Sequence, residues 1–174
     1  MKKTLAAVAA VTLMVVPLWG SSTALAKKSS PPSCYPNCEG VTSTVQYNAY
    51  KANMPNGNFA NSDWSGATLT KATLDSSTFE GANMSSATMT NVKAKNVNFS
   101  GANLTGANLR KATLTGANLT GADLSGATLG HANLENANLT NANLLGAYGK
   151  WKNGKKATFN NTTCPNGTVT NTGC

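Results

Sequence analysis

The chain has 174 residues, enough for one domain with tails, and its composition is unusual for an enzyme. Charged residues make up 11%, against roughly 25% in an average soluble domain, and aromatic residues make up only 6%. The net charge is +8, and the single histidine excludes any mechanism that needs two. These values argue against a core built from many large side chains, and the lack of long charged blocks argues against a solvated disordered chain.

The first 26 residues have the pattern of a secretory signal peptide. Lys2 and Lys3 precede an apolar run at residues 5–16, and residues 24–26 form an A-x-A cleavage site. The run is about twelve residues long, too short for a membrane span of roughly twenty. We therefore expect cleavage after Ala26 and export of the mature chain, which would be secreted, periplasmic or at the cell surface. Loss of Lys2 and Lys3 lowers the net charge from +8 to +6 and leaves no transmembrane span.

Residues 27–51 are expected to form a flexible N-terminal arm and cap, because their first half is rich in Pro and Ser. Cys34 and Cys38 lie in this arm, and Cys164 and Cys174 flank a short C-terminal tail. In an exported chain, four cysteines favour disulfides, and we prefer the local pairing among the three possible connectivities. A four-cysteine zinc site is the competing interpretation, but C-x3-C with two distant cysteines fits zinc poorly.

A five-residue period governs residues 52–146. A small residue precedes each large apolar residue by two positions, and nineteen such units follow one another without insertion or deletion. A period of five matches neither the 3.6-residue repeat of a helix nor the alternation of a plain strand, so the chain must turn a corner after each unit. The large residues expected in the core are Met54, Phe59, Trp64, Leu69, Leu74, Phe79, Met84, Met89, Phe99, Leu104, Leu109, Leu114, Leu119, Leu124, Leu129, Leu134, Leu139 and Leu144.

Units such as residues 102–106, Ala-Asn-Leu-Thr-Gly, resemble the A-(D/N)-L-x-x signature of the pentapeptide-repeat family over just more than half of the chain. The resemblance implies an all-β fold, a right-handed quadrilateral β-helix (solenoid) of about five coils, with one unit for each face. Phe59, Phe79 and Phe99 are spaced by twenty residues, as four faces to a coil require. At the weak unit, Ala94, the larger neighbours Val92 and Val97 conserve the core volume.

Stacked coils also predict contacts between outward residues that are twenty positions apart. Asp75 is expected to lie one coil from Lys95 as an exposed ion pair. A side-chain ladder is expected along the column Asp63, Asn83, Asn103, Asp123 and Asn143.

Residues 147–174 are expected to form a C-terminal cap, with Tyr148 and Trp151, and a Cys-containing tail. The repeats hold equal numbers of basic and acidic residues, so the positive excess lies outside them. The candidate surface-binding residues are Lys150, Lys152, Lys155 and Lys156.

No catalytic, metal or cofactor-binding set is found, so we expect a protein that is not an enzyme and needs no cofactor. His131 occupies an outward corner position that Gly or Asn fills elsewhere, which is typical of a solvated surface residue. The many G-x-x-x-x-G spacings follow from the period, and Gly101 and Gly106 are followed by Ala107 instead of the lysine of a phosphate loop.

Three specific functions are disfavoured. Some members of the family protect DNA gyrase by resembling DNA, but that mechanism needs an acidic cytoplasmic rod. Ice binding needs a long row of Thr-x-Thr, and the row at Thr68 and Thr88 stops at Asn108. Nucleic-acid binding needs a basic patch with aromatic platforms, and export argues against such a partner.

Two functions stay open. The protein is either an exported, non-catalytic binding or structural module, held at anionic cell-envelope polymers or lipid head groups by its basic flanks, or a scaffold that docks a protein partner on a flat face. The simpler interpretation of the lysines is that they keep a rod of low charge soluble. High salt should abolish adhesion by lysines and largely spare docking on a face.

Overall fold

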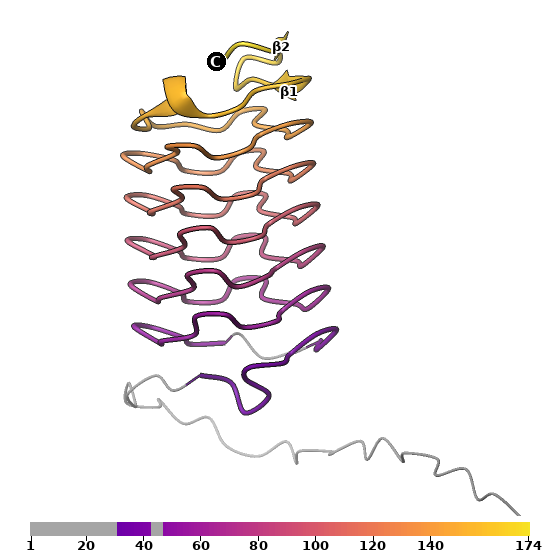
Figure 1. The fold of residues 1–174 in the computed structure, drawn as a ribbon, viewed down its shortest axis with the longest axis vertical. Helices are drawn as coiled ribbons and strands as arrows, with labels where there is room; N and C mark the ends of the chain where they lie inside the picture. The colour runs from indigo at the N-terminus through magenta and orange to yellow at the C-terminus, as the bar shows by residue number, and fades with distance from the viewer. Residues whose placement is uncertain (1–30, 43–46) are drawn as a thin grey trace, which may run out of the picture.

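The computed structural model describes residues 31–42 and 47–174; the predicted signal peptide and its cleavage site at Ala26 lie outside these residues. The chain winds into a rod of stacked coils that runs from the N-terminal to the C-terminal end (Figure 1). In the described part of the chain, no helix has the length and apolar character that crossing a membrane requires.

Parallel bridges join residues that are twenty positions apart. Asn83 pairs with Asn103, Asn103 pairs with Asp123, and equivalent bridges recur at every fifth residue along the repeats. Four bridges in each twenty residues mean that every coil has four sides. Each bridge involves a single residue of each coil, so the sides of the coils are not counted as strands. The helix and strands of the described chain lie at its C-terminal end: the 3-10 helix η1 (Gly154–Lys156) and the antiparallel strands β1 (Thr162–Thr163) and β2 (Val169–Thr170).

The corners between sides are tight turns. At a representative corner, the Ala107 N–H donates to the Leu104 carbonyl over 3.0 Å, and Gly106 between them has a φ of 65°. A positive φ at the third residue is what a type II turn requires, and Gly or Asn supplies it at low cost. A positive φ recurs at every fifth residue from 51 to 146, and at some of these positions the residue is Lys, Ser or His.

The core is a column of large and small inward side chains. All the large residues proposed for the core are buried, and the most exposed of them, Trp64, shows 6% of its surface. Phe79 lies between Phe59 and Phe99, with ring centroids 4.7 and 5.5 Å apart. Around the weak unit, Val92, Ala94 and Val97 are all fully buried. The two valines occupy positions that usually hold alanine, and their extra volume fills the space beside Ala94.

Three hydroxyl residues, Ser62, Ser77 and Thr162, occupy inward positions where the repeats carry alanine; sequence analysis did not single them out. The Ser77 hydroxyl donates to the Met54 carbonyl over 2.7 Å and accepts from the Gly57 N–H over 3.1 Å. The serine therefore bridges a corner of the preceding coil. In the described chain, every buried side-chain polar atom has a hydrogen-bond partner.

The outward column predicted to form a ladder does so, with one interruption. Asn83 donates to Asp63 over 3.1 Å and Asn103 donates to Asn83 over 3.3 Å. Asn143 donates to Asp123 over 3.2 Å. The interruption falls between Asn103 and Asp123, because in each contact the residue of the later coil donates and a carboxylate has no hydrogen to donate.

The predicted ion pair between the side chains of Asp75 and Lys95 is wrong. The two residues do lie one coil apart, but the Asp75 carboxylate accepts from the backbone N–H of Lys95 over 2.8 Å. In the described residues, the salt bridge joins Lys156 and Glu135 instead, with 2.6 Å between Nζ and Oε1. A backbone N–H is fixed by the coil, whereas the long lysine side chain loses entropy when it is held in one position.

The coil ladder continues beyond residues 52–146 at both ends. At the N-terminal end, Asn37 bridges to Asn58 and the Tyr35 ring stacks on Phe59 at 6.3 Å. The Tyr35 hydroxyl donates to the Pro55 carbonyl over 2.6 Å, so Tyr35 covers the exposed end of the aromatic core. At the C-terminal end, Phe159 is buried where the period places the successor of Leu139.

Candidate binding site at the C-terminal end of the rod

The last coil departs from the five-residue register. Tyr148 bridges to Thr128 with the usual spacing, but Lys152 bridges to Asn133, one residue fewer than twenty. Thr158 then restores the spacing by bridging to Asn138, so the segment before it carries one extra residue and forms η1.

This departure leaves the end of the rod hollow. The successors of Leu129 and Leu134 are Gly149, which has no side chain, and Asn153, whose exposed amide donates outward to Asn133 over 2.8 Å. The result is a pocket of about 880 Å³ at the C-terminal end. Its lining is made by Gly149, Lys150, Trp151, Asn153, Gly154, Lys155, Lys156, Phe159, Thr172, Gly173 and Cys174.

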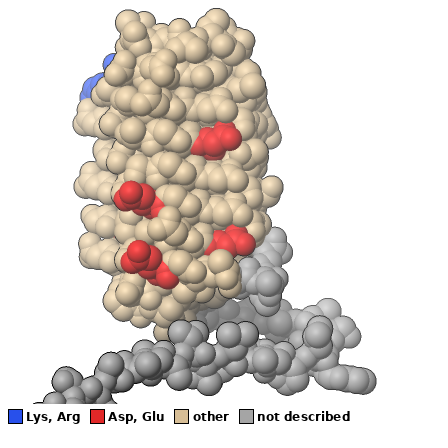
Figure 2. Space-filling view, turned by 90° about the vertical axis from the view of Figure 1, so that its right-hand side faces the viewer, with Lys and Arg blue, Asp and Glu red and all other residues tan. Residues whose placement is uncertain are grey.

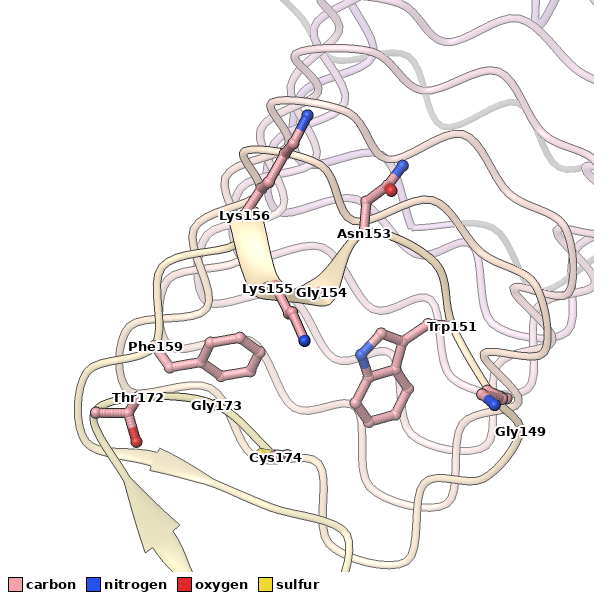
Figure 3. A pocket seen from close by; sticks show the side chains of 11 residues that line it. Gly149, Trp151, Asn153, Gly154, Lys155, Lys156, Phe159, Thr172, Gly173 and Cys174 are labelled. Carbon is pink, nitrogen blue, oxygen red and sulfur yellow. The ribbon is translucent and has the colours of Figure 1, made fainter.

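Two aromatic residues and one lysine face this pocket. Figure 3 shows the rings of Trp151 and Phe159 on either side of it, with the Lys155 side chain directed into the space between them. Gly154 lies under the Trp151 ring, where an added Cβ would stand 2.5 Å from the indole nitrogen. A residue with a side chain at position 154 would therefore displace the Trp151 ring.

The four candidate lysines fall into different environments. Lys150, Lys155 and Lys156 line the pocket, whereas Lys152 is exposed at the bridge beside it. Lys156 points away from the two rings (Figure 3) and is held by Glu135. Within the described chain, the other three have no salt bridge, so their positive charges are free to attract an anion.

A disulfide ties the tail over the pocket. Cys164 is bonded to Cys174, with 5.4 Å between their Cα atoms; β1 ends immediately before Cys164, and β2 lies between the two cysteines in sequence. The second disulfide joins Cys34 and Cys38 at the other end of the rod, which is the local pairing preferred from the sequence. Both ends of the rod are therefore closed by short covalent loops.

The N-terminal end offers much less room. A pocket of about 50 Å³ lies beside the Cys34–Cys38 disulfide, Tyr47 and Trp64. Burial raises the pKa of the Tyr47 hydroxyl. The small volume cannot hold more than one or two water-sized groups, so the C-terminal pocket is the stronger candidate for binding.

The residues that line the pocket are suited to binding an anion or a planar group. Aromatic faces contact planar or apolar surfaces of a ligand, and ammonium groups attract its negative charges. In the described residues, no group of three His, Cys, Asp or Glu side chains is placed to hold a metal ion. His131 stands at a corner with a φ of 61° and is exposed.

The lysines and Trp151 could be identified from the sequence, whereas Phe159 and the loss of inward side chains at Gly149 and Asn153 were not predicted. A signal for Phe159 was present, because Ala157 and Phe159 lie twenty residues after Ala137 and Leu139. The signal was hidden by the irregular register between Tyr148 and Thr158, where the units can no longer be counted in fives.

Comparisons with known proteins agree with this architecture. The sequence model of pentapeptide repeats matches eight copies at residues 52–91, 82–121, 95–130 and 117–148, more than half of the chain. Among curated proteins, none matches this sequence. None of the comparisons indicates an enzyme family.

Several solved structures are similar. HetL from Nostoc sp. strain PCC 7120, a pentapeptide repeat protein involved in heterocyst differentiation regulation, is 27% identical; the match covers 77% of this chain and 64% of that chain, with a TM-score of 0.42. Rfr23 from Cyanothece 51142 is 26% identical, with coverage of 70% and 89% and a TM-score of 0.53. QnrB1, a plasmid-mediated fluoroquinolone resistance protein, is 19% identical, with coverage of 74% and 70% and a TM-score of 0.39. The chain belongs to the pentapeptide-repeat family, whose members fold as right-handed quadrilateral β-helices.

Proposed function

We propose that this protein is an exported, non-catalytic binding module that attaches to anionic polymers of the cell envelope through the lysines at its C-terminal end. The observation that carries the proposal is the C-terminal pocket, where Lys150 and Lys155 stand beside two aromatic rings without a salt bridge in the described chain. No acidic residue is among those that line the pocket, and Glu135 binds Lys156, so an anion placed there would be attracted by Lys150 and Lys155.

Two further observations support export. All four cysteines are in disulfides, which persist in oxidising compartments and are rare in the cytosol. The segment at residues 1–26 has the composition of a signal peptide, although it lies outside the described residues. These two observations are independent, because none of the cysteines belongs to the segment.

The proposal is tested by co-sedimentation of the purified protein with isolated bacterial envelopes at about 50 mM and about 500 mM salt. At the lower salt we expect the protein to pellet, and at the higher salt we expect pelleting to be lost, because screening shortens the Debye length severalfold. A variant with Lys152→Gln and Lys155→Gln removes two unpaired charges at the end and keeps the Lys156–Glu135 pair.

The matched control is Lys93→Gln with Lys95→Gln, which removes the same charge from the side of the rod. Loss of pelleting in the first variant alone supports attachment by the C-terminal end. Equal loss in both variants would reduce the proposal to a net-charge effect. Pelleting that persists at high salt would favour docking of a protein on a flat face, and no pelleting at either salt would contradict attachment altogether.

A further inference from the structure

One corner of the rod carries a line of positive charge. Corner residues twenty positions apart stack on one another, and the corner that contains residues 51, 71, 91, 111 and 131 ends against the carbonyl of Lys150. Residues on this corner or directly beside it form what we call the basic ridge: Lys51, Lys71, Arg110, Lys111 and Lys150.

Backbone hydrogen bonds fix this alignment. The Lys71 N–H donates to Thr90 over 3.0 Å, and the Lys111 N–H donates to Gly130 over 2.9 Å. Between these two coils, the Asn91 N–H donates to the Arg110 carbonyl over 2.9 Å. The side chains of the ridge are all exposed, so the backbone determines where they start and solvent leaves them free to reach a partner.

The acidic residues lie on the other side of the rod. Glu80 immediately precedes a corner that is ten residues from Lys71, which in a coil with four corners is the diagonally opposite one. Glu39 contacts Asn58 over 3.1 Å on the same side, and Asp63 and Asp123 belong to the adjoining face. Figure 2 shows a face with several acidic residues, on which Lys and Arg are visible only near the edge.

The remaining charges of the repeats cancel. Lys93 lies on the face between the ridge corner and a third corner. Asp75, Lys95 and Glu135 follow one another along that third corner, where Glu135 also binds Lys156. The repeats are therefore neutral in sum, but their charge is sorted across the rod, with positive charge on one corner and negative charge on the opposite side.

The fold does not explain why the lysines stand at this corner. Lys51, Lys71 and Lys111 have φ values of 58°, 60° and 58°, in the left-handed region where a side chain with a Cβ is disfavoured. Glycine supplies the same conformation at equivalent corners, as at Gly101 and Gly121. Folding alone would favour Gly or Asn, and lining up like charges adds repulsion, so the ridge is best explained by a partner.

We propose that the basic ridge binds a linear polyanion that lies parallel to the axis of the rod. The inference rests on the proposed attachment to anionic polymers and adds where along the protein the polymer lies. Coils are spaced by about 4.8 Å, so the cations form a narrow row that an extended chain bearing regular phosphate or carboxylate groups can follow. A small anion would meet one or two of them, and the acidic side would repel the polymer from the opposite corner.

The test uses a pair of substitutions that the corner already tolerates. In the ridge variant, Lys71→Asn and Lys111→Asn install the residue found between them, Asn91, which has a φ of 56°. In the control, Lys93→Thr and Lys95→Thr install the residues found one coil later, Thr113 and Thr115. Both variants lose two positive charges, and both keep residue types that the same column contains.

Binding of inorganic polyphosphate and of poly-L-glutamate is measured by titration at several salt concentrations; the two probes separate phosphate from carboxylate recognition. We expect the ridge variant to bind about tenfold or more weakly and to show a shallower dependence of log K on log salt, since fewer counterions are released. We expect the control to bind within about threefold of the wild type.

Each alternative outcome is decisive. Equal weakening in the control and the ridge variant would overturn the ridge as a site. If Lys152→Gln with Lys155→Gln abolishes binding and the ridge variant binds normally, the attachment at the C-terminal end stands and the ridge inference fails. Failure of the wild type to bind either polymer would contradict both the ridge inference and the proposed attachment to anionic polymers. Binding to phosphatidylglycerol vesicles that depends on the ridge, without polymer binding, would replace the polymer by a membrane surface and contradict the inference.

Discussion

At the scale of single residues, the stability of the rod depends on a few buried polar groups that the repeat pattern does not predict. Ser77 replaces an alanine at an inward position, and its hydroxyl holds both the Met54 carbonyl and the Gly57 N–H. This role could not be predicted from the sequence, because serine is as small as the position demands and only the three-dimensional contact across coils shows what the hydroxyl does.

Ser77→Ala is expected to lower the free energy of unfolding by about 1–3 kcal/mol, because the Gly57 N–H loses its partner in a buried place. Chemical denaturation measures the effect. Ser100→Ala, at a half-buried position outside the core, serves as the control and should change stability by less than about 0.5 kcal/mol. A Ser77→Ala protein as stable as the control would show that the corner closes without the hydroxyl.

Asp63 makes the stability of the folded protein depend on pH. The backbone N–H of Ser65, its hydroxyl and the Asn83 amide lower the pKa of the Asp63 carboxyl below its ordinary value. The unfolded chain therefore takes up the proton first as pH falls, and the stability present above the ordinary pKa is lost as pH drops through the folded pKa.

Asp63→Asn keeps a side-chain oxygen that can accept from the backbone N–H two residues later, as Asn83 and Asn103 do in the following coils. We expect the variant to lose less stability than the wild type when urea denaturation is compared at about pH 6 and about pH 3. An identical loss in the two proteins would show that the hydrogen bonds to Asp63 do not favour its charged form.

At the scale of the coil, the five-residue unit predicts the inward and outward positions, because a corner after every unit leaves little freedom to the residues between. The spacing of Phe59, Phe79 and Phe99 alone predicts which rings stack. The ends are harder, since Tyr35 and Phe159 cap the core from segments whose register is irregular. The separation of positive and negative residues onto different corners was also not predicted. The repeats have no net charge, and only the assignment of residues to corners separates Lys71 from Glu80.

Leu104→Ala is expected to cost about 2–5 kcal/mol, since the side chain is fully buried between neighbouring coils, and Leu104→Asp is expected to prevent folding. Leu145→Ala is the matched control, because Leu145 is 51% exposed and immediately follows a core position. Thermal unfolding monitored by circular dichroism distinguishes them. A soluble Leu104→Asp protein with a cooperative transition would contradict the inward assignment.

Substitutions at two glycines distinguish the cost of backbone strain from the cost of steric overlap. Gly121 has a φ of 65° with open space around an added Cβ, whereas Gly149 has a φ of 94° and an added Cβ would stand 2.6 Å from the Gly130 nitrogen. We expect Gly121→Ala to cost about 1 kcal/mol, and Gly149→Ala to cost more, because the last coil must move away from the coil beneath it. Equal costs by urea denaturation would mean that the last coil moves freely.

At the scale of the whole molecule, the protein is a rod whose core is nearly uniform and whose surface is not. Its ends are closed by disulfides, its C-terminal end holds an aromatic pocket with lysines, and its long sides differ in charge. The basic ridge depends on one structural fact: residues twenty positions apart lie on the same corner, and residues ten apart lie on opposite corners.

The measurement that tests this most directly is cross-linking of paired cysteines along the ridge. The pair Lys111→Cys with Asn91→Cys joins adjacent coils on one corner, and the pair Lys111→Cys with Gly101→Cys places the thiols closer in sequence but on opposite corners; the three positions have φ values between 56° and 63°. A bifunctional thiol reagent no longer than about 10 Å, two coil spacings, is added, and the intact mass counts the reagent bound. The structure predicts one bridging reagent in the first pair and two separate adducts in the second, whereas bridging in the second pair, or its absence in the first, would contradict the four-cornered coil.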